Sequence, residues 1–290
     1  MTCLQGVDQQ HGSNIEVFIV DDQSQDETAV LARGYVSNYL NIRIIDGAPL
    51  PAGWLGKSWA CWQGAVQSQA EWLLFIDADV RLEPGMLASA LRYAMQQQLD
   101  MLALFPRILA ASLSERMVLP AFFYLLIGIY PFERINDMRW PAFALGQCVL
   151  IRRRVYQQLG GHASIRNTII EDVALAQLVR NAGYRIAILS APDLLSVRMY
   201  AGWGALVEGM AKHASVGMGD TGLRAVLIAM RQAFLAWWPL DLLLLAFRPD
   251  SLAQRRPLLF VAGCLFTTQF SIWTWAMHRH FGLSWREALL

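Results

Sequence analysis

The sequence predicts an α/β fold, a doubly wound and mostly parallel sheet, followed by C-terminal membrane helices. Two observations predict the sheet: short apolar runs alternate with helix-like segments through the first half of the chain, and two of these runs end in acidic residues. Ligands of such sheets bind at the carboxyl ends of the strands. The third observation is an uncharged run of 20 residues, Leu258–Met277, which is long enough to cross a bilayer.

The expected strands are short apolar runs bounded by polar or turn-forming residues. We expect them at Ile15–Val20, Ile42–Ile45, Trp72–Ile76, Met101–Phe105, Phe143–Ile151 and Tyr184–Leu189. Helices fill several of the segments between these strands. We expect the helices at about Glu27–Val36, Ser58–Gln69, Pro84–Gln97 and Glu171–Asn181, with Asp26 capping the first of them.

Two further apolar segments indicate contact with a membrane. Met117–Phe132 is uncharged but shorter than a span, so we expect a helix in the membrane interface, with a core helix as the alternative. Ala225–Phe247 is interrupted by two charged residues, and we expect it to lie in the membrane plane or to re-enter it. Residues 1–222 are therefore expected to form the α/β domain and 223–290 a membrane-associated helical region.

Composition places the chain between a soluble enzyme and a protein made only of membrane spans. Hydrophobic residues make up 55% of the 290 residues, and the mean hydropathy is +0.32. The formal net charge is only +1, so no overall basic character predicts a nucleic-acid partner. The four cysteines form no C-x-x-C pair, and we expect a reduced, cytosolic setting.

The segment FIDADV places Asp77 and Asp79 directly after an expected buried strand. Two carboxylates at such a position are costly unless a cation neutralises them. Hard oxygen ligands suit Mg²⁺ or Mn²⁺, and such an ion can stabilise a departing diphosphate. The alternative is that both residues are solvated acids of a loop.

Two other acidic segments have both a functional and a purely structural interpretation. Asp22 lies in VDDQSQDET after the first expected strand, where its carboxylate can accept hydrogen bonds from a base or a ribose; the alternative is a polar turn with a capping aspartate. Glu171 and Asp172 open a helix, where the helix dipole alone favours them. Asp172 could instead be the general base for an acceptor hydroxyl.

In their order and spacing these segments resemble the family 2 glycosyltransferases with the GT-A fold. VDDQSQDET is similar to the V-D-D-x-S-x-D-x-T element, FIDADV to the D-x-D metal motif, and GKSWACWQGA to the G-K-x-x-A-x-x-x-G helix start. Gly160-Gly161 followed by Glu171-Asp172 resembles the G-G … E-D acceptor segment. The resemblance covers roughly residues 15 to 190. The GWLGK segment, the RMY stretch and the apolar C-terminus look closest to the hopene-associated (hopanoid) and carotenoid-type membrane enzymes.

The resemblance implies a nucleotide-sugar site built from these motifs in a GT-A-like catalytic domain. Asp22 would recognise the base of a UDP-type donor, and Lys57 would lie close to the nucleotide. Asp77 would face the ribose or the metal. Asp79 would bind the metal, Mg²⁺ or Mn²⁺.

The remaining motif residues are implied to act on the acceptor. Asp172 would be the catalytic base, with Glu171 beside it, and Arg198 and Trp203 would belong to a loop over the diphosphate or the acceptor. The implied activity is metal-dependent, inverting transfer of a hexose to a hydroxyl of a lipid or amphiphilic acceptor. We expect the inner (cytoplasmic) membrane as the location, with the catalytic domain facing the cytoplasm. The Q-x-x-R-W signature of processive members is absent, so we predict no polymerase.

Two alternatives to an active glycosyltransferase remain. The family pattern has another strand and helix before the VDD element, whereas 14 residues precede Ile15, so the first strand is expected to be missing and the chain could be a non-catalytic or truncated membrane-bound remnant. FIDADV also matches the D-x-D-x-V motif of haloacid-dehalogenase phosphatases, with Asp77 as nucleophile and Asp79 as acid/base. A complete strand and two helices before this motif count against the phosphatase.

Overall fold

The computed structural model forms two compact units. The first contains residues 1–109 and 133–199, and the second contains residues 110–132 and 200–290. The structure describes residues 2–10, 15–35, 37, 40–129, 134, 136–137, 142, 144, 146–217, 222–246, 252–281 and 286.

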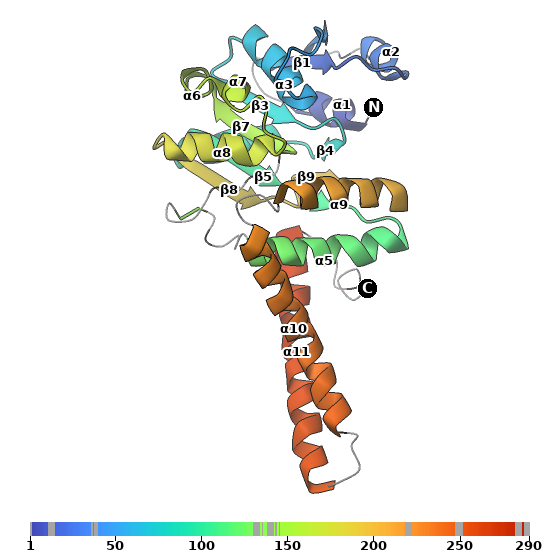
Figure 1. The fold of residues 1–290 in the computed structure, drawn as a ribbon. Helices are drawn as coiled ribbons and strands as arrows, with labels where there is room; N and C mark the ends of the chain where they lie inside the picture. The colour runs from blue at the N-terminus through green and yellow to red at the C-terminus, as the bar shows by residue number, and fades with distance from the viewer. Residues whose placement is uncertain are drawn as a thin grey trace. The chain divides into compact units, whose positions relative to one another are not determined.

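Strands and helices alternate through the first unit (Figure 1). The strands are β1 (Glu16–Asp21), β2 (Asn41–Asp46), β3 (Trp72–Ile76), β4 (Val80–Leu82), β5 (Met101–Phe105), β6 (Arg107–Ile108), β7 (Cys148–Arg152), β8 (Ile186–Ser190) and β9 (Leu195–Val197). The helices are α1 (Thr2–Asp8), α2 (Thr28–Arg33), α3 (Gly56–Gln67), α4 (Met86–Gln96), α6 (Arg153–Gln158), α7 (Gly161–Ser164) and α8 (Glu171–Asn181). Five predicted strands (β1, β2, β3, β5 and β8) and three predicted helices (α3, α4 and α8) agree with the expected bounds to within two residues.

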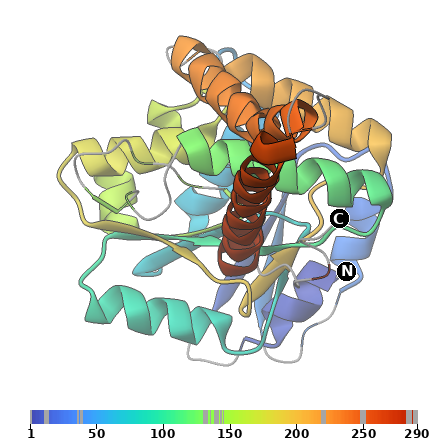
Figure 2. The same cartoon turned by 90° about the horizontal axis from the view of Figure 1, so that it is seen from below.

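Three sheets organise these strands. β1 and β2 pair in parallel, four strands follow the order β3-β7-β5-β8, and three short strands follow the order β4-β9-β6. Helices α4 and α8 pack against β5 and β8, and Figure 2 shows them on opposite sides of the strands. The predicted α/β class, with helices on both sides of the sheet, is confirmed.

The strand pairing is more mixed than the sequence suggests. Among the described strands, β7 runs antiparallel to both β3 and β5, and β4 runs antiparallel to β9. The chain leaves the first unit after residue 109 and returns at residue 133, so β7 is not joined to β5 by the short helical crossover that makes neighbouring strands parallel. The part of the predicted strand at Phe143 and Leu145 lies outside the described residues.

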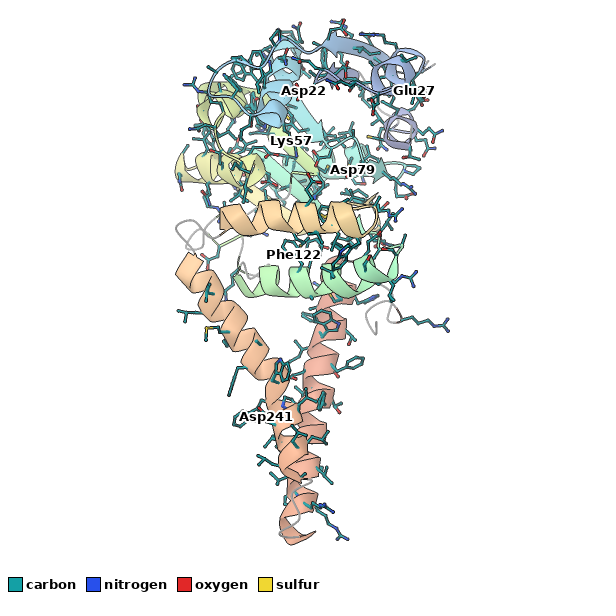
Figure 3. All side chains as sticks on the ribbon, turned by 45° about the vertical axis from the view of Figure 1, so that its right-hand side comes forward. Asp22, Glu27, Lys57, Asp79, Phe122 and Asp241 are labelled. Carbon is teal, nitrogen blue, oxygen red and sulfur yellow. The ribbon has the colours of Figure 1, made fainter. Side chains whose placement is uncertain are left out.

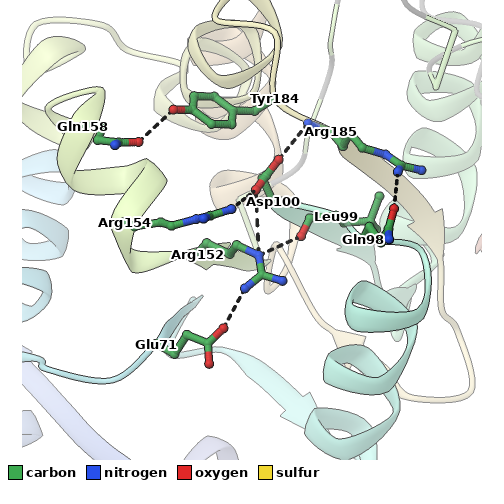
Figure 4. Close-up of polar contacts among 9 residues, drawn as sticks. All are labelled: Glu71, Gln98, Leu99, Asp100, Arg152, Arg154, Gln158, Tyr184 and Arg185. Atoms are coloured by element: carbon green, nitrogen blue, oxygen red, sulfur yellow. Dashed lines mark hydrogen bonds and ion pairs between the residues drawn. The ribbon is translucent and has the colours of Figure 1, made fainter.

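A polar network ties together one end of each strand of the four-stranded sheet, namely the starts of β3, β5 and β8 and the end of β7 (Figure 4). Asp100 precedes β5 and accepts a hydrogen bond from Arg185 N at 3.1 Å, just before β8. Its Oδ1 lies 3.8 Å from Arg152 Nε and 3.5 Å from Arg154 Nη2. Arg152 in turn lies 2.6 Å from Glu71, which precedes β3. The network therefore links four strand ends through few side chains.

The second unit is helical. It consists of α5 (Leu113–Ile129), α9 (Trp203–Gly217), α10 (Gly222–Ala246) and α11 (Leu252–Phe281), and α5 packs with the other three. Large apolar side chains are exposed along α10 and α11, including Phe234, Trp237, Phe260 and Phe270. Among the described residues, one stretch, Arg255–Arg279, is long and apolar enough for a membrane helix.

α10 and α11 lie side by side along the second unit (Figure 1). The end of α10 meets the start of α11 through a 2.8 Å hydrogen bond from Arg255 Nε to Ala246 O. α10 is continuous through Pro239 and Asp241. α10 and α11 therefore form a helical hairpin, and the in-plane or re-entrant position expected for Ala225–Phe247 stays a prediction.

Candidate functional site

Acidic residues follow the strands β1 and β3, as predicted. Asp22 comes directly after β1, and Asp77 and Asp79 lie in the turn between β3 and β4. A Cβ atom on Gly56 would lie 2.7 Å from Asp22 Oδ2, so the Asp22 carboxylate rests against the first residue of α3. Because the next residue is Lys57, α3 brings Asp22 and Lys57 to the same region (Figure 3).

The ammonium of Lys57 joins two acids that come from different elements. Nζ lies 2.8 Å from Asp77 Oδ1, after β3, and 2.8 Å from Glu171 Oε1, at the start of α8. The chain just before α3 is tied to the loop before α8, because Leu55 N donates a hydrogen bond to Arg166 O at 2.9 Å. This backbone contact brings the starts of α3 and α8 together.

Asp172 is held by backbone N–H groups. Gly146 N donates to Oδ2 at 2.6 Å, and Val173 N donates to Oδ1 at 2.7 Å. Burial and then the neighbouring Glu171 carboxylate raise the pKa of Asp172 to about 7, although both hydrogen bonds and Lys57 act to lower it. A carboxyl group with a pKa near 7 is well suited to accept a proton at neutral pH.

Four carboxylates, those of Asp77, Asp79, Glu171 and Asp172, interact with the ammonium of Lys57; we call these four residues the acidic cluster. Burial raises the pKa of Asp77, and burial together with the Asp77 charge raises the pKa of Asp79. The four carboxylates outnumber the single ammonium of Lys57, so an added cation at this cluster would be stabilised.

The acidic cluster fits a hard divalent cation in its chemistry, since carboxylate oxygens are the ligands that Mg²⁺ and Mn²⁺ prefer. Asp79 is exposed, so one of its oxygens can reach an ion. In the part of the chain that the structure describes, no three acidic, histidine or cysteine side chains are arranged to hold an ion by themselves. An ion at Asp79 would need further ligands, such as phosphate oxygens or water.

A buried pair of side chains supports the Gly160-Gly161 turn. Tyr156 OH lies 2.8 Å from His162 Nδ1 and also accepts a hydrogen bond from His162 N at 3.2 Å. Burial lowers the pKa of His162 to about 4, so this residue is neutral at pH 7. A Cβ atom on Gly161 would lie 2.2 Å from the Tyr156 ring, and its φ is +49°, so the turn requires glycine here. These residues have a structural role.

The structure brings most of the predicted site residues together in the first unit, namely Asp22, Lys57, Asp77, Asp79, Glu171 and Asp172. Arg198 follows β9 in the same unit and is exposed. Trp203 opens α9 in the second unit and is 62% exposed. The functional roles of all eight residues stay predictions.

Sequence reasoning missed Gly146. A Cβ atom there would lie 3.0 Å from Lys57 Nζ and 3.2 Å from Asp172 Oδ2, so the bare backbone fits between the two side chains. The contact depends on β7, α3 and α8 meeting in space, which the segment GQC does not record. A glycine just before a buried strand is the only local signal.

Comparisons with known proteins agree with the geometry. The model of the glycosyl transferase family 2 matches residues 2–160. The 4,4'-diaponeurosporenoate glycosyltransferase of Staphylococcus aureus (strain MRSA252) is 31% identical over 71% of this chain and 55% of its own length. The protein of the same name from Staphylococcus haemolyticus is 29% identical over 73% of this chain and 56% of its own length. The chain thus spans about half the length of the curated relatives that it matches.

Among solved structures, the chain is similar to S. aureus TarS 1-349 in complex with UDP-GlcNAc. The sequence identity is 18%, the TM-score is 0.44, and the match covers 74% of this chain and 60% of that one.

Proposed function

Because the chain belongs to glycosyl transferase family 2, we propose that it transfers a sugar from a UDP-linked donor to a hydroxyl of a lipid or amphiphilic acceptor at the membrane. The transfer is a single displacement that inverts the anomeric configuration. The family match removes the ground for the phosphatase alternative, in which Asp77 would be a nucleophile.

One observation supports the proposal above the others: Asp172 combines a pKa of about 7 with a fixed position within the acidic cluster. A single base is enough for an inverting transfer, because a diphosphate leaves without needing a proton. Two backbone N–H groups hold the Asp172 carboxylate, so its orientation is set before the acceptor arrives.

In the proposed step, an oxygen of the Asp172 carboxylate takes the proton of the acceptor hydroxyl. The acceptor oxygen forms a bond to the anomeric carbon, the bond from that carbon to the diphosphate oxygen breaks, and UDP leaves with the electron pair. Asp22 would contact the nucleotide from the end of β1, and Asp79, with Asp77 beside it, would hold the divalent cation. When bound, that ion stabilises the charge on the departing diphosphate.

The acceptor class is open to a direct test, because the curated relatives are named for a carotenoid carboxylate. A carboxylate acceptor is already ionised at neutral pH and needs no base, whereas a hydroxyl acceptor does. The Asp172→Asn variant should therefore slow transfer to a hydroxyl acceptor by roughly 100-fold or more while still binding UDP. With a carboxylate acceptor it should have little effect.

The assay uses the full chain in detergent with UDP-glucose, Mn²⁺, and matched hydroxylated and carboxylated carotenoids. Release of UDP and formation of the glycoside are measured for the wild type and for Asp172→Asn. Retention of the donor's anomeric configuration in the product would refute the inverting mechanism. Near-normal glycoside formation by Asp172→Asn with the hydroxyl acceptor would remove Asp172 as the base.

The alternative of a non-catalytic remnant predicts a different result. A remnant should bind no UDP in calorimetry, with or without Mn²⁺, whereas the proposed enzyme should bind it. Binding that disappears in EDTA and returns with Mn²⁺ would support the metal role of Asp79. Full transfer activity in EDTA would rule that role out.

We place the acceptor in the membrane because α11 contains a stretch that can span it. The inner membrane and a catalytic unit facing the cytoplasm follow from the resemblance and from the supply of nucleotide sugars. Transfer should then require membranes or detergent.

A further inference from the structure

The ammonium of Lys57 is the meeting point of three elements. It extends from the first turn of α3 to Asp77 at the end of β3 and to Glu171 at the start of α8, at 2.8 Å in each case. We infer that Lys57 is a positioning residue, a fixed counter-ion that holds these two carboxylates for the transfer step, rather than a ligand of the nucleotide. The inference rests on the proposed function and differs from the role implied by the family resemblance.

The two carboxylates need such a counter-ion. Their oxygens share one ammonium, so they lie close to each other, and the side chains are only 29% (Asp77) and 13% (Glu171) exposed. Two desolvated like charges at this separation repel, and without a cation between them one would take up a proton or turn away. Asp79 and Asp172 add further negative charge around the same point.

The bonding of Lys57 argues against a primary role in binding phosphate. An ammonium has three donors, and two of them already serve Asp77 and Glu171 at ion-pair distance. Moving the ammonium to a phosphate would leave both carboxylates unpaired.

The ion pair between Lys57 and Glu171 also affects the position of the proposed base, Asp172. Glu171 and Asp172 are consecutive residues in the first turn of α8, and Gly146 fits against both Lys57 Nζ and the Asp172 carboxylate. By anchoring Glu171 to the end of β3, Lys57 sets where the first turn of α8 stands relative to Asp77. Asp172 is thereby positioned through Glu171, without touching Lys57 itself.

The main test compares Lys57→Met with the wild type. Methionine keeps much of the shape and removes the charge. We expect kcat to fall at least tenfold while the Kd for UDP with Mn²⁺, measured by calorimetry, changes less than threefold. Arg43→Met removes an exposed cation that pairs with Glu16 at 3.5 Å and should change neither quantity. A tenfold weaker Kd with an unchanged kcat would instead make Lys57 a donor ligand and overturn the inference.

A double-mutant cycle tests whether Lys57 acts through Glu171. If it does, Lys57→Met combined with Glu171→Gln should be no more than about threefold slower than the slower single variant, since both changes break the same pair. Lys57→Arg, which keeps the charge, should recover part of the lost kcat. Fully multiplicative losses in the double variant would overturn the inference.

A third measurement, thermal unfolding, does not require transferase activity. It can therefore test this inference even if the proposed function is wrong. Lys57→Met should lower the midpoint of thermal unfolding in detergent by several degrees, because it leaves Glu171 and Asp77 unpaired. Adding Glu171→Gln should restore part of that loss. If the wild type binds no UDP, the proposed function fails while this cycle still reports on the pair. Additive losses in unfolding midpoint would show that the pair is absent and overturn the inference.

Discussion

The ionisation of Asp172 sets the pH range of the proposed reaction. Burial and Glu171 raise its pKa to about 7, with Lys57 as the nearby cation that opposes this shift. Only the ionised form accepts a proton, so kcat with a hydroxyl acceptor should rise with pH and level off above about 7. At pH 6 it should be roughly tenfold below the plateau. A steady-state pH profile measures this; a flat profile between pH 5.5 and 8 would contradict the assignment.

Gly146 offers a second test on the same scale. A Cβ atom there would lie 3.0 Å from Lys57 Nζ and 3.2 Å from Asp172, so Gly146→Ala must push the two side chains apart by a few tenths of an ångström. We expect transfer to slow by about tenfold, since small displacements of catalytic groups are costly. Gly204→Ala is the matched control, because a Cβ atom there meets nothing within 4 Å. Equal rates for both variants would refute the packing argument.

Motif residues could be predicted one by one, but their pairing could not. Asp22, Asp77, Asp79, Glu171 and Asp172 each stand at the end of a strand or the start of a helix, which is visible in the sequence. The bridge made by Lys57 depends on α3, β3 and α8 meeting, and no local pattern records that meeting. The same holds for Gly146.

At the scale of elements, we expect Asp100 to help hold the strands of the four-stranded sheet in register. Its side chain is 13% exposed and contacts Arg152, Arg154 and the backbone of Arg185 (Figure 4). Asp100→Ala removes these contacts, and we expect a loss of about 1–3 kcal/mol, seen as a drop of several degrees in unfolding midpoint.

The control for Asp100 is Asp193→Ala. Asp193 forms a surface pair with Arg107 at 3.1 Å and its side chain is 88% exposed, so its removal should hardly change the midpoint. The polar network around Asp100 would lose its proposed role if Asp100→Ala and Asp193→Ala unfolded at the same temperature.

Elements with a long apolar run were predicted well, and short ones were missed. β3, β5 and α8 have the expected bounds because clear apolar runs or an acidic first turn mark them. β4, β6 and β9 contain only two or three residues, too few to show a period of two. The antiparallel direction of β7 is also invisible locally, since it depends on how the chain returns from residues 110–132.

On the scale of the whole molecule, apolar runs predicted helices in the regions of α5, α10 and α11, but not how these helices associate. α5 packs with α9, α10 and α11 in one unit, although α5 lies between β6 and β7 in the chain. Apolar periodicity shows that a helix needs a partner, but not which partner it finds. Pairing of α10 with α11 was missed for this reason.

The last prediction concerns the span in α11. The stretch Arg255–Arg279 has 25 residues, which as a helix is about 37 Å long and exceeds the roughly 30 Å of a hydrocarbon core. Cys264 is exposed on α11, so in a bilayer it faces lipid tails. A variant that keeps Cys264 as its one cysteine should resist a charged maleimide in intact membranes and react once detergent is added. A cysteine in place of Arg256, which is exposed near the start of the helix, should react in permeabilised vesicles without detergent. Equal labelling of both positions in membranes would show that this stretch does not cross the bilayer.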